Sequence, residues 1–497
     1  MFDPVSAAIQ RSGLPAEGRC LHCKVCCRFP LPASPLAPYF SNAEIEEAVA
    51  AGMPRDAFPP GTYGPGHSAH LVAQGETFCC PAFRPSSNDC AVYAARPLDC
   101  RLYPFMLMYD REGRSVLLGL DSLCPATQAS NEAPAWAACA AELARLLDGE
   151  LRAGVVECRG IAGAWKEHVQ PSHSLPNLTR ALCRDDLGLA RAVPTAQATL
   201  IPFFQNHGGN LSYHAFAPIY VWSDLFDLRY KVCGDRLLIF AEGDGDCFLI
   251  CPPLGAGQIV EPAREAADIM GRLNPRAASP RIQDADEISA KELVRAGWRV
   301  RESHVEYLYA RADLAELRGN KYEKKRQLCN RFEREHKWAW RPFDAADLPP
   351  AMALHRAWLK ARTLAHPGEI YAAQAEASCR SIYRGLREAD ALGLVARVLE
   401  ADGRMVGFTV GCALHDLPDG RQAGGRTFHV LFEISDLGVR GAAQFMFREF
   451  CREMSRFEFI NAGSASGLAN LARVKESYRP KLQLSCHTLI PPSAGDH

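Results

Sequence analysis

The uneven distribution of cysteines constrains this chain more than any other feature of its sequence. The chain has 20 cysteines, and they crowd toward its beginning. The later ones occur singly or nearly so, as small buried apolar side chains do. The crowding predicts a separate cysteine-rich domain at the start of the chain. The cysteines before position 125 are Cys20, Cys23, Cys26, Cys27, Cys79, Cys80, Cys90, Cys100 and Cys124.

The sequence predicts a reducing environment for these thiols. The first residues, MFDPVSAAIQRSG, lack the basic and apolar regions of a signal peptide. No run approaches the roughly 18 apolar residues that a membrane span needs. We therefore expect a cytoplasmic protein without a membrane span. Clustered cysteines in that compartment indicate metal ligation rather than a disulfide framework.

The spacing of the first cluster predicts a metal site that other parts of the chain complete. Cys20, Cys23, Cys26 and Cys27 lie within one short segment. Thiolates suit zinc or an iron–sulfur centre, because soft sulfur matches these ions. Adjacent side chains such as those of Cys26 and Cys27 diverge, so one small site needs further ligands. The candidate ligands are Cys20, Cys23, Cys26, Cys27, Cys80, Cys90, Cys100 and Cys124, with Cys79 left out.

Two further points concern this cluster. Arg96 and Arg101 are candidates for balancing its negative charge, or else ordinary surface arginines. Histidines near cysteine clusters are more often surface groups than ligands, so His22, His67 and His70 are left out. The competing interpretation of the cluster is a set of buried free cysteines without a metal.

A second motif strengthens the metal interpretation. The segment 79–105 contains cysteine, tyrosine, arginine and proline residues in the pattern C-x-x-Y-x-x-R-P-x-x-C-R-x-x-P. Together with the first cluster it resembles the CxxCxxCC family of zinc- or iron-chelating domains, over roughly residues 18–126. The resemblance implies bound metal without choosing between zinc and iron, and an iron–sulfur cluster stays open. The matching residues are Cys90, Tyr93, Arg96, Pro97, Cys100, Arg101 and Pro104.

The rest of the chain predicts a mixed helix and strand architecture. A length of 497 residues exceeds what one hydrophobic core usually supports. A formal net charge of −1 argues against wholesale nucleic-acid binding, so any charged interaction surface is local. We predict an α+β protein in which a small cysteine-rich metal-binding domain precedes a tandem α/β domain. The expected boundaries are a first domain at 1–165, a proline-containing linker at 166–189, and two α/β halves at 190–317 and 318–492.

The order of elements in the last part of the chain is that of a GNAT-like acyltransferase core. Two strand-like runs flank the turn Asp402-Gly403, a strong hairpin signal. A third strand follows, then Arg440-Gly441 before a helix with an apolar stripe, a strand, a helix at 468–478 and a last strand. In such cores the amides at a helix start bind anionic groups of the donor.

Several segments carry a resemblance to a known family over about residues 190–492. They are Arg318–Arg326, Glu433-x-x-Asp436-x-x-x-Arg440-Gly441, Asn461, and Gly467-Leu468 through Lys475, Tyr478 and Pro480. They resemble the phosphatidylglycerol lysyltransferase C-terminal domain family. The resemblance implies a tandem GNAT-like fold and an aminoacyl-tRNA donor. The sequence departs from the family at Ala462–Ser466, where acidic residues are usual, and at Ile434, where a basic residue is usual.

The candidate site residues follow from this order. Lys475 is a candidate for neutralising an oxyanion, and Tyr478, three residues on, for protonating a leaving group. The competing interpretation has Tyr478 packed in the core and Lys475 on the surface. Residues 318–337 hold eight Lys or Arg against three Asp or Glu, which favours phosphate binding or else a solvated helix face. The candidate donor-binding residues are Lys321, Lys324, Lys325, Arg326, Arg440 and Gly441.

These observations support two functional hypotheses. The first is an acyl- or aminoacyltransferase that uses CoA or aminoacyl-tRNA as donor and acts on a soluble acceptor, with a structural or redox-sensing metal cluster. The second is a non-catalytic metal or iron–sulfur protein whose GNAT-like domain is a ligand-binding module or scaffold. The missing acidic residues near Ala465 favour the second hypothesis, whereas Lys475, Tyr478 and the basic helix favour the first.

Overall fold

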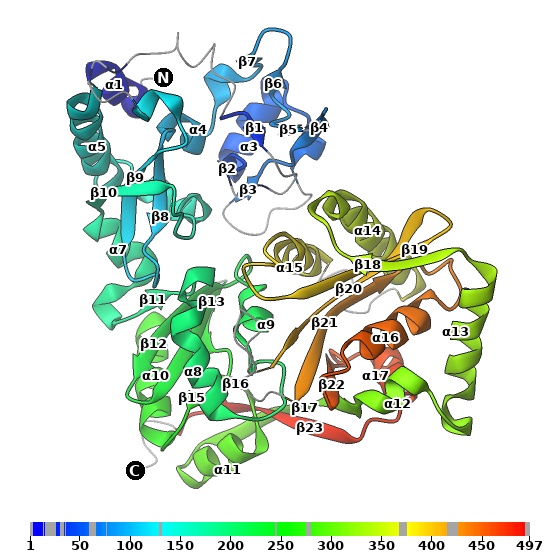
Figure 1. Ribbon diagram of the computed structural model, residues 1–497. Helices are drawn as coiled ribbons and strands as arrows, with labels where there is room; N and C mark the ends of the chain where they lie inside the picture. Colours follow the sequence, from blue (N-terminus) through cyan, green and yellow to red (C-terminus); the bar gives the residue numbers. More distant parts are fainter. Residues whose placement is uncertain are drawn as a thin grey trace. The chain divides into compact units, whose positions relative to one another are not determined.

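The computed structural model describes most of the chain and divides it into two compact units, Met1–Ala196 and Gln197–His497 (Figure 1). Each unit is described by itself below. The described residues are 3–12, 14, 26–29, 34, 36–58, 66–75, 77–128, 132–243, 246–274, 280–366, 375–414 and 426–492.

The first part of unit 1 consists of short elements around a small core. Its centre contains Phe40, Phe58 and Cys80, among other buried side chains. Short strands that each bury few side chains suit a segment held together by ligands rather than by a large core. The elements are α1 (Pro4–Arg11), β1 (Arg28–Phe29), β2 (Tyr39–Ser41), α3 (Asn42–Ala50), β3 (Gly66–Ser68), β4 (Val72–Gln74), β5 (Thr77–Cys79), β6 (Phe83–Arg84), β7 (Asp89–Cys90) and α4 (Leu98–Leu102).

The second part of unit 1 is a three-stranded antiparallel sheet with helices packed on it. The strands are β8 (Phe105–Tyr109), β9 (Val116–Asp121) and β10 (Val169–Ser174), in the order β10-β9-β8. The helices are α5 (Ala133–Asp148), α6 (Arg152–Glu157) and α7 (Pro176–Cys183).

The residues expected to form a linker, 166–189, are folded. They contain β10, which pairs with β9, and α7. The polar and proline residues of β10 fit an edge strand, since most of its side chains are exposed and Pro171 lies beside a shift in register. A polar sequence that contains proline therefore fits an edge strand as well as it fits a linker, and the pattern does not distinguish the two.

Unit 2 is built on one continuous mixed sheet in the order β12-β13-β14-β16-β23-β17-β22-β21-β20-β19-β18. Strand β23, from the end of the chain, lies between β16 and β17 and joins the two halves. Figure 1 shows β23, in red, beside β17. The elements of the first half are α8 (Gln197–His207), α9 (Phe216–Tyr220), β12 (Asp227–Cys233), β13 (Arg236–Gly243), β14 (Asp246–Leu249), β15 (Leu254–Gly255), α10 (Val260–Leu273), β16 (Ile282–Ala285), α11 (Glu287–Arg295) and β17 (Arg299–Ala310).

The second half follows the predicted order of a GNAT-like core. The turn between β19 and β20 places Asp402 at φ 53° and Gly403 at φ 80°, which confirms the hairpin. The elements are α12 (Arg311–Glu316), α13 (Glu323–Glu335), β18 (Trp338–Pro342), α14 (Leu348–Ala365), α15 (Ala375–Arg387), β19 (Val395–Ala401), β20 (Arg404–Ala413), β21 (Thr427–Ser435), α16 (Ala442–Glu453), β22 (Phe459–Ser464), α17 (Ala469–Glu476) and β23 (Leu482–Ile490). The α+β class, with a cysteine-rich first unit and a GNAT-like second unit, is confirmed.

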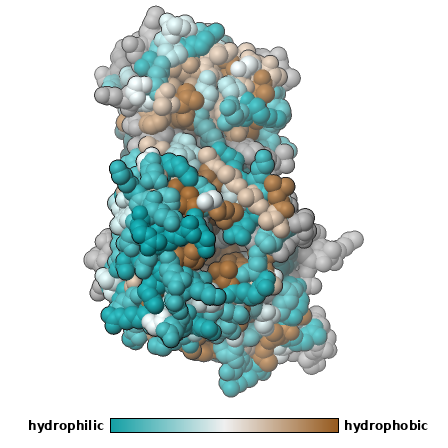
Figure 2. Space-filling view, turned by 90° about the vertical axis from the view of Figure 1, so that its right-hand side faces the viewer, coloured by the Kyte–Doolittle hydropathy of each residue, from teal (hydrophilic) through white to brown (hydrophobic). Residues whose placement is uncertain are grey.

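None of the helices within the described residues is long and apolar enough to cross a membrane. On the face of the molecule in Figure 2, hydrophilic side chains predominate and hydrophobic ones lie in small groups between them. The surface pattern on this face is that of an ordinary globular protein.

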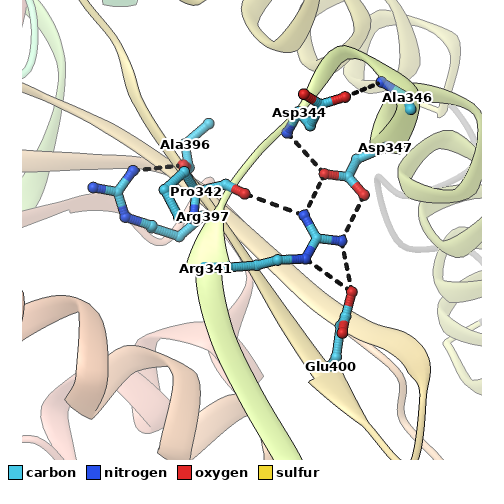
Figure 3. Close-up of polar contacts among 8 residues, drawn as sticks. All are labelled: Arg341, Pro342, Asp344, Ala346, Asp347, Ala396, Arg397 and Glu400. Atoms are coloured by element: carbon cyan, nitrogen blue, oxygen red, sulfur yellow. Dashed lines mark hydrogen bonds and ion pairs between the residues drawn. The ribbon is translucent and has the colours of Figure 1, made fainter.

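The edge strand β18 is fastened to its neighbours by one arginine (Figure 3). Arg341 donates to Asp347, in the turn before α14, at 2.6 and 2.8 Å, and to Glu400 on β19 at 2.6 and 2.9 Å. Burial alone would raise the pKa of Asp347, but the hydrogen bonds from Arg341 hold it below its usual value. One guanidinium thus connects β18, β19 and the start of α14.

We expect Arg341→Met to lower the free energy of unfolding by about 1–3 kcal/mol, because the buried Asp347 loses its charged donor. Urea unfolding measures the change. Arg331→Met is the control, since Arg331 forms an exposed pair with Glu335 on α13, and we expect a loss of at most about 1 kcal/mol there. The lowered pKa of Asp347 means that the pair stabilises at neutral pH and stops doing so in acid, so wild type and Arg341→Met should converge as pH falls. A constant difference down to low pH would contradict this account.

Candidate functional site

Short backbone pairings bring the cysteine segments of unit 1 together. Arg28 on β1 pairs with Cys79 on β5, and the amide of Cys80 donates to the carbonyl of Cys27 at 3.2 Å. The next hairpin pairs Phe83 with Cys90. Segments far apart in sequence therefore meet at the residues that the motif singles out. Cys20 and Cys23 lie outside the described residues.

The thiols at this meeting point act on one another electrostatically. A hydrogen bond with Cys27, followed by burial, raises the pKa of Cys26. The pKa of Cys80 is raised to about 12, first by burial and then by the thiols of Cys90, Cys79 and Cys26, against the opposing effect of a backbone hydrogen bond at Ala82. Burial raises the pKa of Cys100 well above its usual value, with added contributions from Asp99 and from Cys80, Cys90 and Cys26. Several thiolates so close together repel one another unless a cation lies between them, so this donor set fits zinc or an iron–sulfur centre.

The remaining cysteines of unit 1 differ in their surroundings. Cys124 lies beside Tyr103, whose pKa is raised by burial and then by Asp121, Cys124 and Cys26. Tyr103 is therefore affected by the charges of both Cys124 and Cys26. The Sγ atom of Cys79 donates to Gln74 Oε1 at 2.8 Å.

The two arginines of the motif play different parts. The Arg96 guanidinium lies 3.6 Å from the ring centroid of Tyr93, and its charge opposes the rise in pKa at both Cys26 and Cys90. Arg101 instead pairs with Asp3 at 3.1 Å and with Glu44 at 3.5 Å. Arg96 is thus the arginine placed to balance charge at the thiols, and Arg101 fastens α1 and α3 to α4.

In unit 2, strands β21 and β22 form a fork. They pair in parallel over three residues each, ending with His429 opposite Asn461. Beyond that point the ladder stops, and β22 continues beside β17 while β21 continues beside β20. Separation of two adjacent parallel strands opens space for polar groups within a sheet. We call this place, with the side chains around it, the fork.

A fully buried asparagine organises the fork. The Nδ2 atom of Asn461 donates to Glu306 Oε2 at 2.7 Å and to the carbonyl of Asn210 at 2.6 Å. Glu306 also accepts from the amide of Ser212 at 2.9 Å and from its hydroxyl at 2.5 Å. Asn461 Oδ1 accepts from the amide of Gly463 at 2.6 Å. The loop before α9, strand β17 and strand β22 are therefore joined at one point.

Lys475 lies at the fork rather than on the open surface. Its Nζ atom donates to the carbonyls of Ala462, Gly463 and Ser464, the last at 2.6 Å. Burial lowers the pKa of Lys475 to about 8, against the opposing effects of Glu306 and Glu433. In this chain three backbone carbonyls meet the ammonium in the segment where the family tends to carry acidic residues.

Glu433, which carries part of the family resemblance but was not among the predicted site residues, is a further functional candidate. It lies on β21 beyond the fork and keeps part of its surface exposed, yet burial of its carboxyl raises its pKa to about 8. Lys475 opposes this rise, which places the two groups near each other. A carboxyl with a pKa near neutrality can both accept and return a proton. Two signals were available in the sequence: its place in the motif with Asp436 and Arg440, and a glutamate within the otherwise largely apolar strand sequence FHVLFEIS.

Tyr478 lies near these groups, but in a packed environment. Helix α17 ends at Glu476, because Arg479 adopts a φ of 56° and Pro480 follows, so Tyr478 does not continue the helical face of Lys475. The ring of Tyr478 is buried 5.2 Å from that of Phe447. Burial raises its pKa well above the usual value, and Glu433 adds to the effect. The spacing of three thus brought Lys475 and Tyr478 to one region, but not to one helical face.

The predicted basic residues are placed unequally. Lys321 pairs with Asp313 at 3.2 Å, and Lys325 lies 4.1 Å from the ring centroid of Tyr478. Arg326 donates to the carbonyls of Leu317, at 2.5 Å, and Gly319, so it closes the turn before α13. Lys324 is exposed.

Arg440 and Gly441 lie at the start of α16, as expected. Arg440 is exposed, and Gly441 has a φ of +90°. A Cβ atom at Gly441 would lie 2.4 Å from the carbonyl oxygen of Leu328 on α13. The glycine is therefore required where α13 approaches the start of α16, and this approach covers one side of the predicted anion site.

Comparisons with known proteins agree with this geometry. Residues 208–486, more than half of the chain, match the family model described as phosphatidylglycerol lysyltransferase, C-terminal. The chain belongs to this family. Residues 19–130 match the CxxCxxCC family, described as a zinc- or iron-chelating domain. No curated protein matches the chain.

Solved structures of similar fold cover part of this lysyltransferase-family chain. A conserved protein of unknown function from Bacteroides thetaiotaomicron VPI-5482 is 20% identical, with a TM-score of 0.54 over 61% of this chain and 99% of that one. L-PGS from Bacillus licheniformis is 14% identical, with a TM-score of 0.42 over 60% of this chain and 92% of its own. FemX is 9% identical, with a TM-score of 0.39 over 60% and 96%. The first of these comparisons supports a shared fold and says nothing about function.

We expect the double variant Cys90→Ser, Cys100→Ser to bind less metal than wild type and to melt at a lower temperature, because it lacks two of the converging thiols. Elemental analysis of anaerobically purified full-length protein measures the metal. Cys139→Ser is the matched control, since Cys139 is a buried cysteine on α5 of the same unit. Full metal content in the double variant would show that these two residues are not ligands.

We expect Gly441→Ala to lower the free energy of unfolding by about 1–3 kcal/mol, through the positive φ and the contact with Leu328. Gly403→Ala, which has a φ of +80° and no atom within 4 Å of its Cβ position, should cost only about 1 kcal/mol. Chemical denaturation of both variants separates the steric contribution from the backbone contribution. Equal losses of unfolding free energy in the two variants would mean that α13 shifts away from the new methyl group at no measurable cost.

Proposed function

We propose that unit 2 is an aminoacyl- or acyltransferase whose reaction takes place at the fork, with Glu433 as the general base. The supporting observation is a carboxyl with a pKa near 8 on the strand that leaves the fork, close to the ammonium of Lys475. Membership of the phosphatidylglycerol lysyltransferase C-terminal family supports group transfer as the reaction class. The donor is an aminoacyl-tRNA or a CoA thioester, and the acceptor is a soluble molecule with a free amine or hydroxyl.

The proposed reaction needs one group that moves a proton twice. The acceptor nitrogen or oxygen attacks the carbonyl carbon of the donor, a new bond to that carbon forms, and the bond to the tRNA oxygen or CoA sulfur breaks. Ionised Glu433 takes the proton from the acceptor and returns it to the leaving oxygen or sulfur. A pKa close to the working pH suits both transfers.

The residues around Glu433 have supporting roles in this proposal. Lys475 is a positioning residue, because its hydrogen bonds to carbonyls 462–464 fix the end of β22. Its charge also favours the ionised form of Glu433 and developing negative charge on the donor carbonyl. Tyr478 is a second proton donor beside Glu433, as the sequence hypothesis has it. Exposed Lys324 and Arg440 are the best placed of the predicted residues to bind donor phosphates.

Unit 1 adds a metal centre to this proposal. Cys26, Cys80, Cys90 and Cys100 would hold zinc or iron, with Cys27, Cys124 and the preceding Cys20 and Cys23 as further candidates. A bound ion would neutralise the thiolates and stabilise a unit with short strands. We assign the centre a structural or redox-sensing role in a cytoplasmic protein.

The second hypothesis, a ligand-binding module or scaffold without catalysis, is favoured by two observations. Lys475 already donates to three carbonyls, and Tyr478 packs in the core with Phe447. Under that hypothesis Glu433 recognises a ligand amine and transfers nothing. The two hypotheses differ in whether Glu433→Gln removes turnover or only affinity.

We expect Glu433→Gln to reduce transfer by a factor of about 10²–10⁴, because the amide cannot accept the proton. Transfer of label from mixed aminoacyl-tRNA or from acetyl-CoA to an amine acceptor measures the activity. Because the base must be ionised, wild-type kcat/KM should fall as pH drops below about 8. Glu302→Gln, an exposed glutamate on β17, is the matched control and should keep wild-type activity. A wild-type protein that binds donor but transfers nothing over this pH range would support the scaffold instead.

A further inference from the structure

A second cluster of ligating side chains lies in the first half of unit 2, apart from the cysteine cluster. His207 ends α8, His214 follows seven residues later, and Asp286 precedes α11. One ligand atom from each lies within 4.8 Å of the others. His207 Nε2 is 3.3 Å from Asp286 Oδ2, and the two imidazole centroids are 5.0 Å apart.

We propose that His207, His214 and Asp286 bind a divalent first-row metal ion, with zinc as the best match. Two imidazole nitrogens and one carboxylate oxygen form a common three-ligand set for zinc, which leaves a fourth position for water. Tetrahedral zinc with bonds of about 2.0–2.1 Å separates its ligand atoms by roughly 3.3 Å. The hydrogen-bonded atoms His207 Nε2 and Asp286 Oδ2 already have this separation, and a ligand atom of His214 lies within 4.8 Å of both residues' ligand atoms. This site goes beyond the proposed transferase function.

Asp286 is held in the orientation that a ligand needs. Its Oδ1 atom accepts from the amides of Ile288 at 2.9 Å and Ser289 at 3.0 Å. Its Oδ2 atom, which faces His207, accepts from the hydroxyls of Tyr213 at 3.0 Å and Ser289 at 2.7 Å. Hydrogen bonds of this kind orient a ligating carboxylate from outside the coordination sphere.

The chain also makes room for His214. Gly209 has a φ of +103°, and a Cβ atom there would lie 2.2 Å from His214 Cε1. A glycine at this position thus lets the loop pass over a buried imidazole. His214 Nδ1 accepts from the amide of Leu211 at 3.2 Å, so this nitrogen carries no proton. Coordination through Nδ1 would replace this one neutral hydrogen bond with a metal–imidazole bond.

The position of the site connects it to the fork. The loop between the two histidines carries Asn210 and Ser212, which bond to Asn461 and Glu306. A metal ion held by His207, His214 and Asp286 would fix both ends of this loop. We therefore assign the ion a structural role that stabilises the polar groups of the fork.

Cobalt(II) titration of the metal-free full-length protein under anaerobic conditions tests the proposal. Cobalt bound by thiolates in unit 1 gives sulfur-to-metal charge-transfer bands, whereas cobalt bound by imidazole and carboxylate gives only weak visible bands. We expect Asp286→Asn to bind one cobalt fewer per chain than wild type, with the charge-transfer bands unchanged. The asparagine oxygen still accepts the amides of α11, so the fold is preserved.

Two further variants complete the test. His207→Gln should also bind one cobalt fewer than wild type. We expect cobalt-loaded wild type to show paramagnetically shifted imidazole N–H signals, and His207→Gln to lack them. His304→Ala, which removes another His–Asp pair of unit 2, should lose no cobalt. Circular dichroism of each metal-free variant checks that it is folded. The proposal is overturned if wild type lacks the shifted imidazole signals, or if folded Asp286→Asn and His207→Gln both bind as much cobalt as wild type.

Discussion

The pairing of the last strand with strands of both halves is the constraint on which unit 2 depends. Strand β23 pairs with β17 from Arg299 opposite Ile490 to Leu308 opposite Leu482, and its other edge pairs with β16. The helix that carries Lys475 directly precedes β23, and Glu306 lies on β17. The same ladder that closes the sheet therefore sets Lys475 near Glu306. If this long-range pairing were lost, the fork would lose both its carboxylate and its ammonium.

The fork shows how a fold can bury several polar groups by bonding them to one another and to the backbone. Asn461 bonds to Glu306, to the loop before α9 and to its own strand. Lys475 bonds to three carbonyls of a segment that has lost the acidic side chains usual in the family. Backbone oxygens neutralise no charge, and the carboxyls that oppose the fall in the pKa of Lys475 are those of Glu306 and Glu433. In the proposed function, Glu433 is the residue that moves the proton.

Sequence patterns succeeded where the determining interactions are local. The Asp402-Gly403 turn, the strands of both halves and the stripe of α16 follow from backbone preferences and from alternation of apolar residues. The cysteine motif indicated which thiols converge, since Cys26, Cys80, Cys90 and Cys100 act on one another. The same reasoning fell short at Tyr478, where a turn ends α17 early, and at Arg326, which bonds to backbone carbonyls before α13. The positions of Tyr478 and Arg326 depend on contacts that the spacing of residues in the sequence does not predict.

The sequence by itself determined the two-part organisation, the thiol-rich first unit and the order of elements in the GNAT-like second unit. These properties depend on residue type and on neighbours within a few positions. Only the tertiary structure decided that Glu433 has a pKa near 8, that Lys475 lies at the end of β22, and that two histidines meet Asp286. The reason is that desolvation and Coulomb interactions depend on which distant segments surround a group. The segments around Glu433 and Lys475 come together through the separation of β21 from β22 and through the pairing of β23 with β17.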